Sequence, residues 1–297
     1  MNVLFVGAGK RVTMANLFKQ RGYRVFSYEI SKNVPIATAA NVVEGLKWSD
    51  PNILQDIDLT CDRCNIDIVI PFQDEAIGLC ARVTNAKSMC RNELTALLCY
   101  DKKLFEDYIL RSHSHLYPKV EDDAPKIYKP IHGFGSRGLI KSVEYLDLDP
   151  KQYILQKCIN GQEYSVDCFS NSTGKFIDGV PRKRLEVCCG EVSQSITTDY
   201  PELVQICETI SNDLHLQGPS CFQFIIDAHQ RPYIMEINYR FGGGCTLSID
   251  AGFDMIGLLT QEVFGTIFES PINFYTPKSW VKNLKMIRYF QDFVYES

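Results

Sequence analysis

Two short runs near the C-terminal end of the chain carry residues that could bind a metal ion. They are FQFIID at 222–227 and PYIMEIN at 232–238, separated by AHQR. If they pair as a hairpin with a four-residue loop, Gln223 lies opposite Glu236 on one face. Asn238 lies two residues beyond Glu236 and shares that face. One carboxylate and two amide oxygens are hard ligands of the kind that Mg²⁺ prefers.

The same register divides the hairpin into a polar and an apolar face. It begins with Asp227 opposite Pro232. Ile225 and Ile234 fall on the polar face, which we therefore predict to be half-buried rather than solvated. The other face is predicted to hold Phe222, Phe224, Ile226, Met235 and Ile237. A solvent-facing polar strand is the competing interpretation.

A glycine-rich stretch, YKPIHGFGSRG at 128–138, could bind phosphate. Its glycines let backbone N–H groups approach an anion, and Lys129 adds a cation at the end of a predicted strand. Arg240 supplies a further cation and precedes a second glycine run at 242–244. The combination predicts a phosphate clamp, although a glycine-rich loop is also compatible with a plain turn.

The elements that must position these residues begin with an alternating pattern. Apolar runs at 2–7, 23–30 and 66–73 read as strands. Helical patterns up to about residue 20 and over 51–65 separate them. Strands that alternate with helices predict a parallel sheet covered by helices over about the first 95 residues.

The rest of the chain alternates less regularly. Asp101 is a predicted N-cap of a helix. Further strands are expected at 126–130 and 153–159, followed by a turn and another strand, and a helix is expected at 201–216. The hairpin and a helical C-terminal region follow.

Gly7 and Gly9 follow the first predicted strand and invite comparison with a dinucleotide-binding turn. The third glycine of that fingerprint would fall at Val12, so the pattern is incomplete. A nicotinamide-dependent oxidoreductase is therefore the weaker alternative, and a tight strand-to-helix turn is the simpler interpretation.

Two further groups could contact a substrate. Asp74 and Glu75 follow the buried run at 66–73, at the edge of a parallel sheet where ligands commonly bind. They could receive an amino group, but a helix N-terminus also favours acidic residues. Arg184 or Lys183, in the basic stretch PRKRLEV, could face a substrate carboxylate or an acyl phosphate. A solvated basic turn is the alternative.

Composition narrows the classes of function. The net charge is −5 without a basic block, which does not suggest binding to nucleic acid or to a membrane surface. No apolar stretch approaches the length of a membrane span, and the first residues do not read as a signal peptide. The 12 cysteines are scattered, and the lone pair Cys61 and Cys64 lacks the second pair that a zinc site needs. We expect a cytoplasmic protein with reduced cysteines.

Taken in order, four motifs resemble those of the ATP-grasp superfamily, most closely its carbamoyl-phosphate-synthase-large-subunit-like branch. They are DKKLF at 101–105, YKPIHGFGSRG, LQKCINGQEYSVD at 155–167 and FQFIIDAHQRPYIMEINYRFGGG at 222–244. The resemblance covers almost the whole chain and implies a single grasp module. It implies an α/β (α+β grasp) fold, with a Rossmann-like parallel-sheet domain at 1–98 and a two-lobed ATP-grasp domain at 99–297. A lid subdomain is expected at about 115–158.

The resemblance also implies how the nucleotide is bound. Lys102 and Lys129 would contact the phosphates of ATP. The loop that closes over the phosphates would use Gly133, Gly135, Ser136 and Gly138. Main chain from Lys157 to Ile159 would read adenine, with Gln156 where the family usually has a glutamate. Glu163 would hold the ribose.

The remaining implied roles concern the metal and the reaction. Glu236 and Asn238 would bind Mg²⁺, or Mn²⁺ as an alternative, with Gln223 at a further ligand position. Arg240 would stabilise the phosphoryl group during transfer, beside Lys129 and Arg184 as candidate catalytic residues.

The expected function is an ATP-dependent carboxylate–amine ligase that forms an acyl phosphate. Its partners would be a small carboxylate and an amine, with no nucleic acid or membrane; a homodimer is left open. Two alternatives remain: a catalytically silent ATP-binding regulatory protein, and an ATP-grasp enzyme with a bicarbonate or hydroxyl acceptor. The length leaves no room for a full carbamoyl-phosphate synthase.

Overall fold

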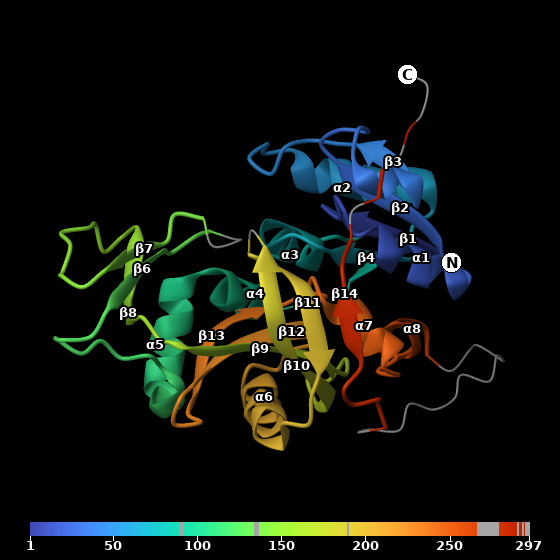
Figure 1. Cartoon of the computed structure of the whole chain (residues 1–297). Helices are drawn as coiled ribbons and strands as arrows, with labels where there is room; N and C mark the ends of the chain where they lie inside the picture. Colours follow the sequence, from blue (N-terminus) through green and yellow to red (C-terminus); the bar gives the residue numbers. More distant parts are fainter. Residues whose placement is uncertain are drawn as a thin grey trace.

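The computed structural model describes residues 1–88, 92–133, 137–188, 190–265, 279–289, 291, 292 and 294 of the 297-residue chain. Its N-terminal part is a five-stranded parallel sheet in the order β3-β2-β1-β4-β5 (Figure 1). The strands are β1 (Asn2–Val6), β2 (Arg24–Glu29), β3 (Asn41–Glu44), β4 (Ile68–Pro71) and β5 (Lys87–Ser88). The helices are α1 (Val12–Gln20), α2 (Ile53–Cys64) and α3 (Asp74–Ala81). The predicted parallel sheet is confirmed.

Strand β1 is apolar because it is buried on both faces. Val3 and Phe5 belong to one core cluster, and Leu4 and Val6 belong to another on the opposite side of the sheet. A continuous apolar run is typical of a central parallel strand, since helices cover both of its faces.

The remainder of the chain forms two antiparallel sheets. The six-stranded sheet has the order β13-β12-β9-β10-β11-β14, and the three-stranded sheet has the order β7-β6-β8 (Figure 1). The six strands are β9 (Gly161–Ser170), β10 (Phe176–Cys188), β11 (Glu191–Thr197), β12 (Gly218–Asp227), β13 (Pro232–Asn238) and β14 (Lys285–Ile287). The three are β6 (Lys126–Pro130), β7 (Ile140–Ser142) and β8 (Tyr153–Lys157). The fold is thus mixed α/β, as predicted.

Helices cover the six-stranded sheet on its apolar face and at its edge. Phe222, Phe224 and Ile226 of β12 pack into a core shared with three of these helices. The helices are α4 (Glu93–Tyr100), α5 (Lys102–Ser112), α6 (Pro201–Asp213), α7 (Cys245–Asp250) and α8 (Met255–Phe264). The predicted cap of α5 is confirmed, because the Asp101 side chain accepts hydrogen bonds from the amides of Lys103 and Leu104. None of the described helices is long and apolar enough to cross a bilayer.

The β12–β13 hairpin has the predicted Gln223–Glu236 pairing but a different loop register. Ile226, not Asp227, lies opposite Pro232, and a bulge between Gln223 and Phe224 restores the predicted pair. The bulge also exchanges two side chains between faces, because one inserted residue shifts the two-residue alternation. Ile234 is 1% exposed in the core, whereas Met235 is half-buried on the site face. Both residues had been predicted on the opposite faces.

Several elements escaped the sequence analysis: the strands β3, β5, β7, β10, β11 and β14 and the helices α3 and α4. The expected helical C-terminal end holds for α7 and α8, but β14 then adds a strand to β11. The predicted division after residue 98 falls within α4 and stays a prediction, as does the lid at 115–158, which spans β6 to β8.

Candidate active site

The polar face of the six-stranded sheet carries two of the three predicted metal ligands, Gln223 and Glu236, in one row. Glu236, Gln223, Ser165 and Arg182 occupy aligned positions on β13, β12, β9 and β10. Neighbouring positions in a sheet bring side chains on the same face into contact. The sheet therefore brings together side chains as far apart in the sequence as Ser165 and Glu236.

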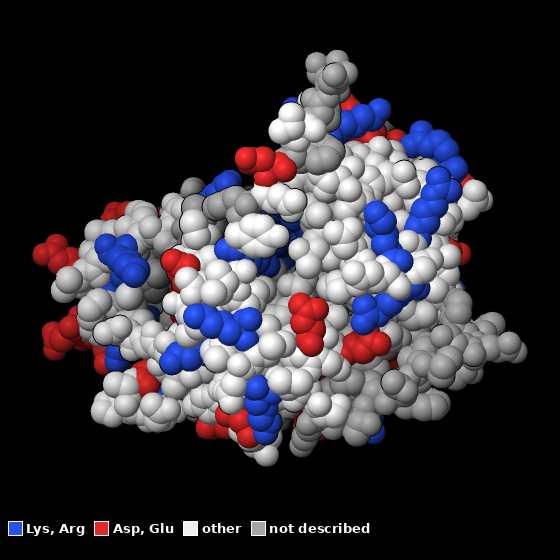
Figure 2. Space-filling model, turned by 45° about the vertical axis from the view of Figure 1, so that its right-hand side comes forward, with Lys and Arg blue, Asp and Glu red and all other residues white. Residues whose placement is uncertain are grey.

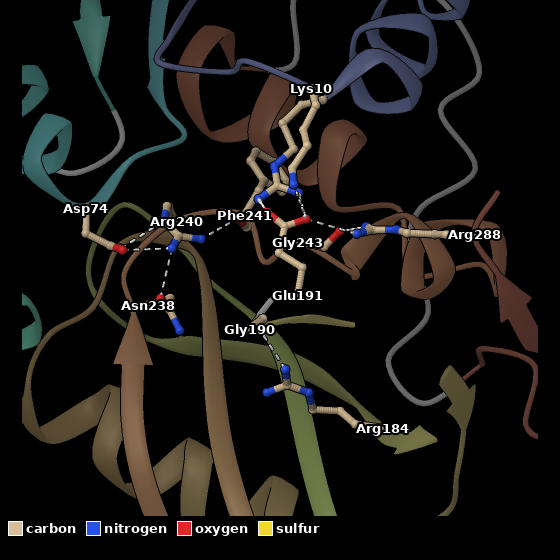
Figure 3. Close-up of polar contacts among 11 residues, drawn as sticks. Lys10, Asp74, Arg184, Gly190, Glu191, Asn238, Arg240, Phe241, Gly243 and Arg288 are labelled. Atoms are coloured by element: carbon tan, nitrogen blue, oxygen red, sulfur yellow. Dashed lines mark hydrogen bonds and ion pairs between the residues drawn. The ribbon is translucent and has the colours of Figure 1, made fainter. Parts of the chain in front are cut away.

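A chain of hydrogen bonds leads from Glu236 to the N-terminal domain. Asn238 Nδ2 donates to Glu236 Oε1 at 3.0 Å, and Arg240 Nη2 donates to Asn238 Oδ1 at 2.9 Å. The Arg240 guanidinium also donates to both carboxylate oxygens of Asp74, at 2.8 and 2.9 Å (Figure 3). Asp74 is thus a partner of Arg240 across the two parts of the chain. The two-pronged pairing fixes the orientation of Arg240, because the planar guanidinium matches the carboxylate.

Arg184 lies on the same face, where the sequence placed it as a candidate. Its Nη1 donates to Gln223 Oε1 at 2.8 Å and lies 3.3 Å from Glu163 Oε2, and its Nη2 donates to the carbonyl of Gly190. Arg184 is 8% exposed, and its buried Nε has no hydrogen-bond partner in the described part of the chain. A solvated basic turn is therefore excluded for this residue.

Two lysines face the polar side of β13 from the neighbouring elements. Lys129 on β6 is half-buried, and among the described residues its one hydrogen-bond partner is the sulfur of Met235, 3.8 Å from its Nζ. Burial lowers the pKa of Lys129 to about 8, with Glu236 opposing this shift and Lys102 adding to it. Lys102, the first residue of α5, donates from Nζ to the carbonyl of Gly133 at 2.7 Å. Both lysines thus converge on the glycine-rich loop and Glu236.

The loop itself is described only in part. Gly138 adopts a φ of +72°, a conformation that side chains other than glycine rarely adopt, and a Cβ there would lie 3.0 Å from Pro130 Cγ. Gly133 is described as well. Gly135 and Ser136 lie outside the described residues.

The segment expected to read adenine has its amides partly occupied. The amide of Lys157 donates to the carbonyl of Pro118, and the amide of Cys158 donates to that of Pro125. Ile159 follows the end of β8. Gln156 is buried with an Oε1 that has no partner in the described residues. This orphaned oxygen lies at the position where the ATP-grasp resemblance places a glutamate.

The oxygen atoms of Glu236, Gln223 and Asn238 suit a hard divalent cation, but two of them already accept hydrogen bonds from arginines. The half-buried Glu236 carboxylate makes no ion pair within the described chain. The amide oxygens of Gln223 and Asn238 are already held by Arg184 and Arg240. Oxygen ligands fit Mg²⁺, but these two amides would have to leave their arginines to coordinate it.

Sequence reasoning missed a buried ion pair beneath this face. Arg182 donates to both oxygens of Asp167, at 2.6 and 2.9 Å, and the two side chains are 1% and 0% exposed. The glycine run at 242–244 was the available signal. A Cβ at Gly244 would lie 2.5 Å from Arg182 Nη1, and one at Gly242 would lie 2.8 Å from Asp167 Oδ1. These two glycines make room for the pair and do not simply flank a metal, as their position had suggested.

A second charged cluster joins the GAGKRV turn to the C-terminal strands. Arg11 donates to both oxygens of Glu191 at 3.2 and 3.3 Å, and Lys10 and Arg288 approach the same carboxylate at 3.5 and 3.3 Å (Figure 3). Arg288 also donates to the carbonyl of Gly243. These cations hold the pKa of Glu191 below its usual value, although burial opposes them. The turn at Gly7 and Gly9 therefore positions cations for an interdomain contact.

Two family models match successive parts of the chain. "PylC-like, N-terminal domain" matches residues 3–93, and "ATP-grasp in the biosynthetic pathway with Ter operon" matches residues 149–283. The chain thus combines a match to a PylC-like N-terminal domain with a match to an ATP-grasp domain, each over less than half of its length. No curated protein matches its sequence.

Solved ATP-grasp structures share the fold at low sequence identity. The N5-carboxyaminoimidazole synthetase of Staphylococcus aureus, complexed with ADP, has 16% identity and a TM-score of 0.67 over 89% of this chain and 77% of that chain. The L-amino acid ligase of Bacillus licheniformis has 16% identity and a TM-score of 0.66 over 89% and 74%. The biotin carboxylase domain of the Hydrogenobacter thermophilus 2-oxoglutarate carboxylase, with MgADP and bicarbonate, has 13% identity and a TM-score of 0.70 over 96% and 73%.

Proposed function

We propose that this protein is an ADP-forming ligase that uses ATP to join a small carboxylate to an amine. The observation that carries the proposal is the state of Lys129 and Glu236. Both are half-buried charges without an ion-pair partner in the described residues. Isolated buried charges are costly, so a site that keeps them open is suited to a ligand that brings opposite charges. A metal-bound triphosphate brings both.

The nucleotide would lie between the three-stranded sheet and β13. Lys102 and Lys129 would bind its phosphates, and Gly133 and Gly138 would contribute to the loop over them. The main chain at Ile159 would contact adenine, because the preceding two amides are already used within the protein. Glu163, which is 45% exposed, would accept from the ribose.

Glu236, Asn238 and Gln223 would hold Mg²⁺. When bound, the metal would neutralise charge on the β- and γ-phosphates. Arg184 and Arg240 now occupy the two amide oxygens, so binding would free both guanidinium groups toward the phosphates. Mn²⁺ is an alternative ion for the same oxygen ligands.

The chemistry needs no nucleophile from the protein. A carboxylate oxygen of the substrate attacks the γ-phosphorus, and the bond to the bridging oxygen of ADP breaks. The amine then attacks the acyl carbon, phosphate leaves with the bonding electrons, and the nitrogen loses a proton. Arg240, fixed by Asp74, would stabilise the charge on the phosphoryl group in transit.

The relatives support this class but leave the acceptor open. An L-amino acid ligase and N5-carboxyaminoimidazole synthetases share the fold, and a biotin carboxylase domain was solved with bicarbonate. Bicarbonate is therefore the second candidate acceptor. A cytoplasmic location and a homodimer stay predictions from the sequence.

Release of ADP tests the proposal directly. The protein is incubated with MgATP and pools of small carboxylates and amines, and products are identified by mass. We expect ADP and phosphate only with a matching pair of substrates. Glu236→Gln should abolish turnover, whereas Glu208→Gln on the exposed side of α6 should leave it unchanged. Tight MgATP binding without ADP release in any pool would favour a silent regulatory protein.

A further inference from the structure

A cavity in the N-terminal domain lies outside the proposed nucleotide site. It has a volume of about 210 Å³ and lies at the carboxyl ends of β1, β2 and β4. Among its lining residues are Gly7, Glu29, Leu46, Trp48 and Gln73. None of the residues assigned above to ATP or metal lines it. The volume is below the roughly 300–1,000 Å³ of pockets for drug-sized ligands, so the cavity suits a small molecule.

The wall of this cavity is built at close range around Gly7. Gly7 has a φ of +70°, and a Cβ there would lie 2.5 Å from Gln73 Cγ and 3.0 Å from Trp48 Cζ2. The absence of a side chain lets Gln73 and Trp48 approach the turn. The first glycine of GAGKRV is thus explained by the shape of the cavity.

Glu29 is a buried carboxylate with one oxygen left open. It is 8% exposed, and its Oε1 accepts from the amide of Gly9 at 2.9 Å and from Ser27 Oγ at 2.6 Å. Its Oε2 has no partner within the described ranges, and no Lys or Arg there forms an ion pair with it. Lys10 and Arg11, the two cations of the turn, pair instead with Glu191. Glu29 therefore lacks the cation that a buried carboxylate normally has.

The chemistry of the cavity favours an ammonium group over a sugar. A vicinal diol is best recognised by both oxygens of a carboxylate, but Oε1 of Glu29 already accepts two hydrogen bonds. An ammonium group needs only Oε2 and also supplies the missing charge. The face of Trp48 can add an attraction to a cation, and Leu46 offers an apolar wall for an aliphatic stem. The Gln73 amide supplies one more polar group.

We infer that this cavity binds the ammonium group of a small aliphatic ligand. That the ligand is a substrate rests on the proposed ligase function, whereas the selectivity for ammonium does not. An ammonium held at Glu29 is protonated and cannot be the attacking amine. The substrate would therefore carry a cationic amine in addition to its reacting group.

The chain has two tryptophans, and they provide a direct test. Trp48 lines the cavity, whereas Trp280 is buried in the core shared by the two parts of the chain. Their indole N–H resonances are followed by NMR at pH 7 during titration with n-pentylamine or its neutral counterpart 1-pentanol, with Trp48→Phe for assignment. We expect a saturable shift of Trp48 with the amine, no shift of Trp280, and at least roughly ten-fold weaker binding of the alcohol, since only the ammonium adds an opposite charge to its hydrogen bond with the Glu29 carboxylate.

Glu29→Gln should weaken the amine by at least roughly ten-fold. Glu44→Gln is the matched control, because Glu44 is exposed, lies opposite Glu29 on β3 and outside the cavity lining, and loses the same charge. Equal binding of the amine and the alcohol by the unmodified protein would overturn the inference, as would an unchanged affinity in Glu29→Gln. The titration contains no ATP, so its result tests the inference even if the protein does not bind MgATP.

Discussion

Two sets of charges, one within the six-stranded sheet and one between that sheet and the three-stranded sheet, are treated in opposite ways. Arg182 and Asp167 are 1% and 0% exposed and neutralise each other through two hydrogen bonds. Ser248 Oγ donates a further hydrogen bond to Asp167 Oδ2. Glu236 lies farther along the face, and Lys129 faces it from β6; both are only half-buried and make no ion pair in the described chain. The first set is satisfied within the fold, whereas the second is the one that we propose binds a ligand.

The comparison separates residues that hold the fold from residues that we propose to serve the reaction. Arg182 and Arg184, two positions apart on β10, look alike in the sequence. Their contacts differ, because Arg182 is enclosed by Gly244 and Asp167 while Arg184 reaches Gln223 and Glu163. Changing one set should affect stability, and changing the other should affect ligand binding.

The largest effect is expected for Arg182→Leu. The substitution leaves Asp167 buried without a partner, which should lower the free energy of unfolding by about 3–5 kcal/mol. Denaturant unfolding measures it. The control is Arg231→Leu, because Arg231 is 61% exposed in its pair with Asp227 and should cost less than about 1 kcal/mol. Equal losses in the two variants would remove the distinction drawn here.

Lys129→Met should act on the ligand rather than on the fold. We expect turnover to fall by about 10²–10³-fold, as for loss of one group that stabilises transferred charge. The unfolding free energy should stay the same or rise, because the variant removes an unpaired half-buried charge. Lys151→Met, at an exposed turn, serves as control. A large loss of stability with intact turnover would place Lys129 in the structural set.

Asp74→Asn tests whether the interdomain pair positions Arg240. The variant loses the charge that holds the guanidinium, so we expect kcat to fall by roughly ten-fold while the KM for ATP changes little. Glu75→Gln is the neighbouring control. A rise in KM with unchanged kcat would assign Asp74 to ligand binding instead.

The smallest expected effect is the uptake of protons when MgATP binds. Because the pKa of Lys129 is lowered to about 8, the unliganded side chain loses its proton as pH rises past 8. A triphosphate favours the charged form, so MgATP binding at pH 8.5 should take up a fraction of a proton, and affinity should fall above pH 8. Calorimetry in two buffers with different ionisation enthalpies measures the uptake. Lys129→Arg should remove it, because arginine stays protonated.

The sequence predicted the fold class and much of the site because both depend on local patterns. Alternating strands and helices indicated the parallel sheet, and the two-residue period placed Gln223 opposite Glu236. That second result was reached through a wrong loop register, which the bulge compensated. A bulge depends on packing across the whole hairpin, so period counting alone could not place Ile234 and Met235.

The contacts between distant segments were beyond such reasoning. Asp74 was considered as a substrate contact, but at the start of α3 it pairs with Arg240 from the other part of the chain. The acid that faces a cavity is instead Glu29, whose single open oxygen follows from hydrogen bonds to Gly9 and Ser27. The distribution of surface charge does not single out a site either, because Lys/Arg and Asp/Glu side chains are both spread over the face in Figure 2.

Phe241, the residue after Arg240, limits how the N-terminal domain can be exchanged. Phe241 packs against Phe18 of α1 and against Phe72, which follows β4, with ring centroids 6.2 and 6.1 Å apart. The aromatic contact and the Arg240–Asp74 pair therefore join the two domains at the same point. Exchange of the first domain for that of a relative would change substrate preference only if this seam were transplanted with it, and heating should melt both halves in one cooperative transition.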